Sequence, residues 1–309
     1  AAAMDAFEPF YPYTRLVTYD EEEERSHLWS YEPADQCVRS LCIFCDPADG
    51  FRYFASVSEE GEFMILMEDL IQENIPGAGV NRADSQGWGY VSDIQQIGQH
   101  VYACGFSGQV YKRWQANDWR HMDDGLLQAP GTPMDDAIAL SVIGGPHEDA
   151  IYAAGYQYTA GFPPKLFFFN GQQWRAIPLP EAAGRITNMH VASADCIWLC
   201  GDDGTLLMGN ADDGFKSLAP QSEHQVFTSV TEFEARIYLA SDLGLFVYDL
   251  AQPDAGICKV KTTLDPDLQD ANVVEARGQV LWSIGPKDIA RFNGKTWERM
   301  QHPDNPRIA

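Results

Sequence analysis

Carboxylates are the side chains through which this chain could do chemistry. The 309 residues include 45 acidic and only 21 basic side chains, which gives a net charge of −24. Two carboxylates that converge in a pocket can serve as general acid and general base, and Asp202 with Asp242 are the pair considered for that role. The sequence therefore allows an enzyme, or a carbohydrate-binding protein, that uses such a pair in a central funnel-shaped pocket.

Other signatures of catalysis or metal binding are missing. Cys37, Cys42 and Cys45 lie close together, but no second CxxC motif or histidine pair completes a zinc site. Cys42 and Cys45 would also point to opposite faces of a strand, so we predict buried structural thiols. Gly105-Phe106-Ser107-Gly108 lies between two strands rather than before a helix, which excludes a nucleophile elbow. The sequence therefore predicts no catalytic residue, no metal and no cofactor.

The element that must position any functional group is clearest at Ile151–Trp174. In Leu166–Phe169, as in the strand that precedes it, apolar residues occupy both alternating positions, which is typical of a strand covered on both faces. Asn170-Gly171 then predicts a tight turn, because both residues accept a positive φ. Phe169 and Trp174 can pair across this hairpin, in a register that depends on whether its loop has two or four residues.

Six copies of this unit follow one another along the chain. The second strand of each copy carries an aromatic residue, at intervals of 40 to 50 residues: Tyr53, Tyr102, Tyr152, Trp198, Tyr238 and Trp282. A later hairpin repeats an aromatic residue five positions before a tryptophan, at Trp114–Trp119, Phe169–Trp174 and Phe292–Trp297. This spacing leaves room for four short strands in each copy.

Four strands in about 45 residues, repeated, resembles the β-propeller superfamily of WD40, kelch and sialidase-type proteins. The resemblance covers Val38 to Gln301, without the signature motifs of those three groups. It implies an all-β fold, a β-propeller of six four-stranded blades. Arg15–Tyr19 and Leu28–Tyr31 are two further strands, which form either a hairpin that seals the ring or part of a seventh blade. We predict six blades in a single domain over residues 4–309, with residues 1–3 left from cloning.

The predicted binding surface lies on the loops. In a propeller, the loops between second and third strands and the loops between blades share one face. One of them, Tyr156–Pro164, is longer than its counterparts and carries three aromatic residues, which could alternatively fold back onto their own blade. Aromatic side chains ringed by carboxylates suit a protein interface. The predicted partner-binding residues are Tyr156, Tyr158, Phe162, Glu59, Glu60, Asp202, Asp203 and Asp242.

The charge limits the classes of partner. Residues 1–75 alone contain 17 acidic side chains and four arginines. Nucleic acids and anionic membranes bind surfaces of the opposite sign, so we expect neither as a partner. A basic protein would be attracted at long range, although acidity that serves only solubility is the alternative explanation.

We therefore expect a non-catalytic, strongly acidic propeller that binds another protein. More specifically, we expect an inhibitor or immunity-type antidote whose carboxylates occupy the cationic cleft of a basic bacterial effector or toxin. An assembly scaffold is a further alternative, beside the enzyme or carbohydrate binder. The chain shows no apolar leader and no run of roughly 18 apolar residues, which predicts a cytoplasmic protein. We expect it to be a monomer before it binds.

Overall fold

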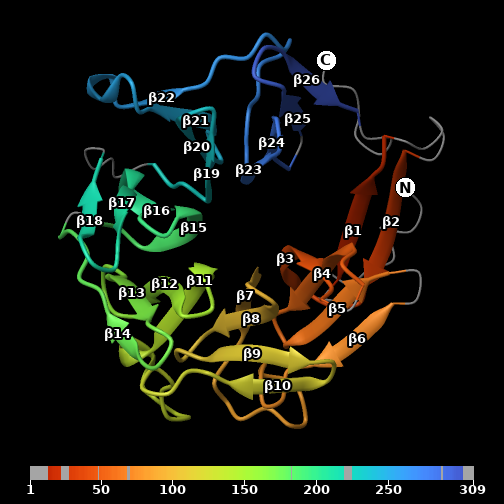
Figure 1. Ribbon diagram of the computed structural model, residues 1–309, viewed down its shortest axis with the longest axis vertical. Helices are drawn as coiled ribbons and strands as arrows, with labels where there is room; N and C mark the ends of the chain where they lie inside the picture. The colour runs from red at the N-terminus through yellow and green to blue at the C-terminus, as the bar shows by residue number, and fades with distance from the viewer. Residues whose placement is uncertain are drawn as a thin grey trace.

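The structure is a computed structural model that describes residues 13–21, 28–47, 49–67, 70–181, 183–218, 225–286 and 288–301. These residues form six four-stranded antiparallel sheets, arranged as blades around a central axis (Figure 1). The predicted six-bladed β-propeller is therefore confirmed. A separate two-stranded sheet pairs β1 (Thr14–Tyr19) with β2 (Trp29–Ala34).

Each blade uses four consecutive strands, and its first strand lies nearest the axis (Figure 1). Blades one to three are β3 (Val38–Cys45), β4 (Arg52–Ser58), β5 (Glu62–Leu66), β6 (Ile71–Asn74); β7 (Val91–Ile97), β8 (His100–Gly105), β9 (Val110–Gln115), β10 (Asp118–His121); and β11 (Ile138–His147), β12 (Ala150–Gln157), β13 (Pro164–Phe169), β14 (Trp174–Ala176). Blades four to six are β15 (Ile186–Ser193), β16 (Cys196–Gly201), β17 (Leu206–Asn210), β18 (Gly214–Ser217); β19 (Ser229–Phe233), β20 (Arg236–Ser241), β21 (Gly244–Asp249), β22 (Ile257–Lys259); and β23 (Val273–Arg277), β24 (Val280–Ile284), β25 (Ile289–Phe292), β26 (Trp297–Met300).

Helical structure in the described ranges is limited to three one-turn 3₁₀ segments, η2 (Met134–Asp136), η3 (Asp202–Gly204) and η4 (Pro253–Ala255). None of these could cross a membrane, being far too short.

The second strands are apolar at both alternating positions because each blade has a neighbour on each face. All six of the predicted aromatic residues lie in second strands, which confirms the repeat. In β8, Tyr102 packs into the core shared by blades two and three, whereas Ala103 packs into the core shared by blades one and two. Successive side chains of a strand point to opposite faces, so each second strand contributes to two cores.

The Asn-Gly hairpins have four-residue loops. Phe169 pairs with Trp174 in blade three, and Phe292 pairs with Trp297 in blade six. The Asn170 side-chain oxygen accepts hydrogen bonds from the backbone amides of Gln172 and Gln173, at 3.1 and 3.0 Å. Gly171 adopts a φ of 86° while Asn170 keeps a negative φ, so the turn is not the two-residue type with two positive φ angles.

The corresponding hairpin of blade two has a different register. Its turn is tighter, with Asn117 at a φ of 60°, and the pairing shifts between Asp118 and Trp119. Trp119 therefore lies opposite Arg113 and is buried, whereas Trp114 is half exposed. The shared five-residue spacing therefore does not give Trp114 the place of Phe169, because the turn rather than the spacing sets the register.

The ring closes through the N-terminal hairpin. On one side of it, Leu16 and Ala34 pack against Met64 of blade one. On the other side, Trp29 Nε1 donates a hydrogen bond to the backbone oxygen of Gln301, just after β26, at 3.1 Å. Of the two alternatives left by the sequence, the structure therefore has a sealing hairpin beside six complete blades (Figure 1).

The cysteine prediction is correct for one of the three clustered residues. All seven cysteines have free thiols. Cys42 is buried between blades one and two, but Cys37 is partly exposed and Cys45 is exposed. Cys45 lies three residues after Cys42 on the same strand and so points to the opposite face, where no neighbouring blade covers it.

Candidate functional site

A hollow of about 290 Å³ lies near the axis, where the inner strands of blades one, two and three meet. Its walls include Arg39 at the start of β3, Tyr90 before β7, Phe106 after β8 and Tyr156 in β12. Tyr90 lies in a blade-to-blade connection and Phe106 lies in a turn between second and third strands, so both sets of loops share this face. No carboxylate is among the described residues that line the hollow, and the suggested acid–base pair therefore does not meet there.

An aromatic cluster borders the hollow. We define it as Tyr90, Phe106, Tyr156, Tyr158 and Phe162. The ring centroids of Tyr156, Tyr158 and Phe162 lie 5.4 to 5.8 Å apart. Phe106 lies 5.9 Å from Tyr158 and 6.4 Å from Tyr90, which links the long loop of blade three to blade two. The edge-on and tilted arrangements are those that aromatic quadrupoles favour.

The rings of the long loop neither stand free nor fold back onto their own blade alone. Tyr156 and Tyr158 are partly buried, whereas Phe162 remains 42 % exposed. Backbone hydrogen bonds fix the loop: the Tyr158 amide donates to Ala137 and the Phe162 amide donates to Thr159, at 2.8 and 2.9 Å. Phe162 adopts a φ of 44°, a conformation that side chains other than glycine rarely take. The loop therefore presents a fixed aromatic surface.

Arg185 of blade four holds the other side of the cluster. Its guanidinium carbon lies 5.1 Å from the ring centroid of Tyr156 and 6.0 Å from that of Phe162. Its Nε lies 3.0 Å from the carboxylate of Asp202, which fixes the guanidinium over the rings. Burial, and then the neighbouring Tyr158 hydroxyl, raise the pKa of Tyr156, so this phenol stays neutral. The predicted residues Tyr156, Tyr158, Phe162 and Asp202 are therefore brought together.

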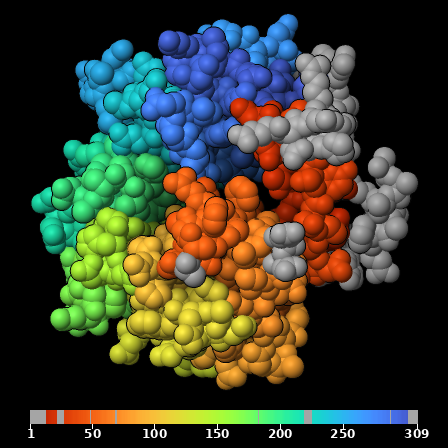
Figure 2. Space-filling view, turned by 45° about the vertical axis from the view of Figure 1, so that its right-hand side comes forward, coloured from red at the N-terminus to blue at the C-terminus, as the bar shows by residue number. Residues whose placement is uncertain are grey.

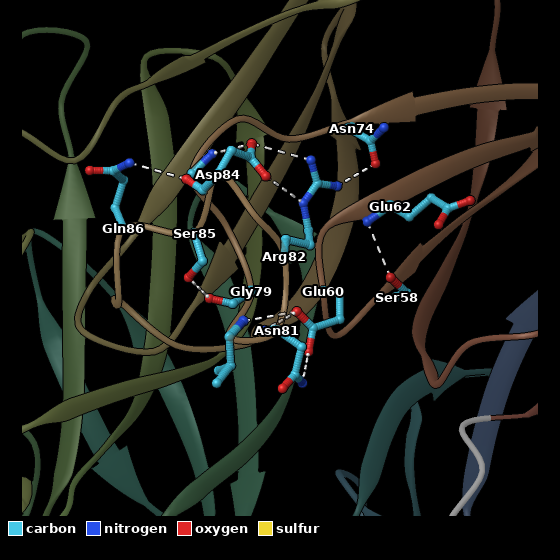
Figure 3. A network of polar contacts seen from close by, with 12 residues as sticks. Ser58, Glu60, Glu62, Asn74, Gly79, Asn81, Arg82, Asp84, Ser85 and Gln86 are labelled. Atoms are coloured by element: carbon cyan, nitrogen blue, oxygen red, sulfur yellow. Dashed lines mark hydrogen bonds and ion pairs between the residues drawn. The ribbon is translucent and has the colours of Figure 1, made fainter.

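The predicted acidic residues of blade one have two different roles. Glu59 pairs at 2.5 Å with Arg39, which lines the hollow, although Glu59 itself is not part of the lining. The carboxylate of Glu60 instead accepts hydrogen bonds from the Val80 amide and from the backbone and side chain of Asn81, at 2.7 to 2.9 Å (Figure 3). Glu60 therefore organises the loop between blades one and two.

The same loop is stabilised along its length by further polar contacts. Arg82 bonds to the Asp84 carboxylate at 3.0 Å and also contacts Asn74 of β6 (Figure 3). The Ser85 hydroxyl donates to the Gly79 oxygen at 2.7 Å. Side chains of this loop thus hold it against blade one.

Asp203 and Asp242 lie in turns of blades four and five. Asp203 adopts a left-handed φ of 57° within η3, a conformation that aspartate tolerates better than most residues. Asp242 is exposed and accepts a hydrogen bond from the neighbouring Ser241 hydroxyl at 3.1 Å. Neither residue contacts the aromatic cluster through an interaction in the described part of the chain.

Sequence reasoning missed Tyr90, Phe106, Arg39 and Arg185. Each lies at the same end of a blade as the long loop: Tyr90 and Arg39 at first strands, and Phe106 in the turn between second and third strands. Superposing the repeats and asking which residues occupy equivalent loop positions could have found the first three. Arg185 gives no such signal, because its role depends on contact with a loop from another blade.

Among the described residues, no group of three or more His, Cys, Asp or Glu side chains is placed to hold a metal ion. The close acid–histidine contacts are pairs, such as His121 with Asp123 at 2.8 Å.

Comparison with known proteins gives one sequence relative and many structural ones. No protein-family model matches the chain. It is 29% identical over 219 residues to the immune protein Tsi7 of Pseudomonas aeruginosa. This match covers 69% of the chain and 65% of Tsi7, so the chain spans slightly less than two thirds of the length of that relative.

The solved structures that resemble the chain are propellers. The WD40 β-propeller domain of Doa1 superposes with a TM-score of 0.58 at 10% identity, over 87% of this chain and 84% of that one. YCF48 bound to D1 peptide gives a TM-score of 0.58 at 10% identity, covering 94% and 85%. YCF48 from Cyanidioschyzon merolae gives 0.57 at 12% identity, covering 85% and 84%. The chain thus has the β-propeller fold, and in sequence it is similar to an immunity protein.

Proposed function

We propose that this chain is a non-catalytic immunity protein that binds and neutralises a basic protein toxin. The observation that carries the proposal is the similarity to Tsi7, which extends over 219 residues. The net charge of −24 supports a basic partner, because opposite charges accelerate encounter. The basic charge of the toxin and its identity are part of the proposal.

The face that carries the aromatic cluster is the proposed binding surface. Tyr and Arg are enriched among residues that dominate binding energy, and here Arg185 is already fixed over Tyr156 and Phe162. A surface that is rigid before binding loses little conformational entropy on binding. Glu59 and Asp202 add charge at its edges, each paired with an arginine that a partner's own cation could displace or share.

The proposal is tested by capture and by protection. The immobilised chain is exposed to a lysate of its source organism at low and high salt, and retained proteins are identified by mass spectrometry. We expect a basic toxin whose retention weakens as salt rises, because salt screens the attraction. Co-expression of the chain should protect cells from the captured toxin. Capture of no toxin, or of a toxin that remains lethal beside the chain, contradicts the proposal.

The binding surface has its own test. The double substitution Tyr158→Ala with Phe162→Ala should raise the Kd for the captured toxin by about tenfold or more, as expected for aromatic anchors. Leu250→Ala, an equally simple truncation of an exposed residue at the opposite end of blade five, is the control. Equal binding by both variants places the interface elsewhere.

A further inference from the structure

The six junctions of the ring are not equivalent. Five of them, between consecutive blades, contain a continuous apolar core. The sixth, between blade six and blade one, has only the small cluster of Leu16, Ala34 and Met64, to which no described residue of blade six contributes. The hairpin β1–β2 therefore packs against one wall of this closing junction, and the opposite wall meets it through polar contacts such as Trp29 with Gln301.

The wall formed by blade one is apolar, and part of it is exposed. Leu41 is 55 % exposed and Phe54 is 52 % exposed. Both point away from blade two, because Cys42 and Ala55, their chain neighbours, belong to the core of the first junction. Phe54 follows the repeat aromatic Tyr53 as Ala103 follows Tyr102, yet Ala103 is fully buried. Blade one thus exposes a phenylalanine where blade two buries an alanine.

Blade six presents a matching wall. Val273 and Ile284 pair across β23 and β24 and are 43 % and 39 % exposed. They point away from blade five, whose shared core contains Val274 and Leu281 instead. Ile284 follows Trp282 by two positions as Ala240 follows Tyr238, and Ala240 is fully buried. Both walls therefore carry larger apolar side chains than the sealed junctions have at equivalent positions.

The hairpin extends this apolar surface. Leu16 faces blade one, so Val17 on the same strand points the other way, and it is 44 % exposed. Figure 2 looks onto this side of the molecule, where the red hairpin and the orange blade one border a hollowed surface below the blue blade six. Apolar patches that a soluble protein leaves exposed commonly bind another protein.

We propose that the closing junction receives an extended segment of the toxin, apolar along its middle and flanked by lysine or arginine, which packs against Leu41, Phe54, Val273 and Ile284. This inference rests on the proposed function and names a second contact region for it. The junction and the hollow at the aromatic cluster both border β3, since Arg39, which lines the hollow, lies only two residues before Leu41 on this strand. One partner can therefore contact both.

Charge argues for a basic partner rather than a second copy of this chain. The described residues of the hairpin and blade one, between positions 13 and 75, hold ten acidic side chains against three arginines. Two copies that bring this region together repel each other, each with a net charge of −24. Flanking lysines or arginines on a toxin segment would be attracted to the same region.

A photo-crosslinking amino acid placed at position 41 identifies the occupant. With the captured toxin present, irradiation should link the chain to one extended segment of the toxin, which peptide mass spectrometry then locates. The same residue placed at position 250, which is exposed on blade five, should not crosslink. Crosslinks to a second copy, or to another part of the same chain in the presence of toxin, overturn the inference.

Binding measurements separate this inference from the proposed function. Leu41→Thr with Phe54→Thr keeps β-forming residues but removes the apolar surface, and should raise the Kd for the captured toxin about tenfold. Leu250→Thr is the matched control. If toxin binds both variants equally, the junction inference is wrong and the proposed function stands. If no toxin binds even the unaltered chain, both are wrong.

A measurement on the isolated chain checks that the junction is open. The neutral dye Nile red fluoresces on apolar surfaces, and the unaltered chain should enhance its fluorescence. Leu41→Thr with Phe54→Thr should lose most of that enhancement, whereas Leu250→Thr should keep it. Equal dye fluorescence from all three proteins would show that the junction is closed in solution, which overturns the inference.

Discussion

Blade one contributes its two faces to two very different junctions. The face with Cys42 and Ala55 is sealed against blade two in a core that also contains Val57 and Phe63. The opposite face carries Leu41 and stays half open, although its side chains are as apolar. The comparison teaches that apolar side chains on a strand do not by themselves make a core, because burial depends on whether a neighbouring blade packs closely on that side.

Polar groups differ between the two junctions in the same way. In the sealed one, the buried Glu73 of β6 bonds to Arg113 at 2.6 and 2.9 Å and to Trp119 Nε1 at 2.9 Å. In the closing junction, Arg291 pairs with Glu21 and Glu298, all of them at least partly exposed. A buried ion pair makes its junction intolerant of losing one partner, whereas an exposed pair contributes little.

The largest expected effect is therefore at Glu73. Glu73→Ala leaves the Arg113 charge buried without a partner and should lower the free energy of unfolding by about 3–5 kcal/mol. Denaturant unfolding followed by circular dichroism measures this. Glu73→Gln, which keeps an acceptor for Trp119, should lose less. A loss from Glu73→Ala no larger than that of Glu298→Ala in the closing junction would show that the two junctions do not differ in this respect.

Two leucines, one in a sealed junction and one in the closing junction, allow the stability contributions of the two apolar clusters to be compared. Leu140 is fully buried between blades two and three, and Leu140→Ala should cost about 2–5 kcal/mol of unfolding free energy. Leu16→Ala in the closing junction should cost less than about 2 kcal/mol, since its cluster is small and can relax. Equal losses in the same denaturant titration would mean that the hairpin seals its junction as firmly as a blade does.

Asp93, which bonds across two sealed junctions, should make the stability of the fold depend on pH. Its carboxylate accepts hydrogen bonds from the Ser40 hydroxyl of blade one and the Ile143 amide of blade three, at 2.5 and 2.9 Å. Burial raises its pKa from 3.8 to about 6 despite these bonds. Because the unfolded chain ionises first as pH rises, the stability that Asp93 contributes should fall between pH 3.8 and about 6.

Thermal unfolding of the unaltered chain and of Asp93→Asn across this pH range tests the sign. The midpoint of the unaltered chain relative to the variant should fall as pH rises to about 6 and stay level above it. Subtracting the variant removes the contribution of the other acidic groups, Glu148 among them, whose pKa is shifted the opposite way. Burial alone would raise that pKa, but the hydrogen bonds from Lys112 and His100 bring it down to about 2. A level difference throughout would contradict the assignment to Asp93.

The smallest expected effect on stability comes from two substitutions in the closing junction, and it tests the comparison most directly. Leu41→Thr with Phe54→Thr should change the free energy of unfolding by no more than about 1 kcal/mol, because both side chains are already half exposed. Denaturant unfolding measures this in the same series. A loss of several kcal/mol would mean that these side chains belong to a core and are not available to a partner.

Local signals in the sequence were sufficient to predict the blades. The aromatic residue of each second strand, Tyr53 to Trp282, marks a strand that two neighbours cover, and that pattern repeats because every blade solves the same packing problem. The hairpin register was less accessible. Trp114 and Trp119 have the same spacing as Phe169 and Trp174, but a two-residue turn at Asn117 moved them out of register.

The candidate site was predictable only in part. The long loop was visible as an aromatic insertion with Tyr156, Tyr158 and Phe162. Its contacts with Phe106 and Arg185 were not, since these join blades two, three and four through residues far apart along the chain. Glu60 illustrates the reverse error, because it lies on the expected face but its carboxylate already bonds to the loop between blades one and two.

The sequence by itself determined that this chain makes six four-stranded blades and that it carries a net charge of −24. Periodicity, turn residues and net charge are local or additive properties, so they can be read without coordinates. Tertiary structure alone decided which apolar side chains are buried and which stay exposed. Phe54 and Ala103 occupy equivalent positions in neighbouring blades, and Ala103 is buried while Phe54 is exposed because only blade two is packed closely against the blade before it.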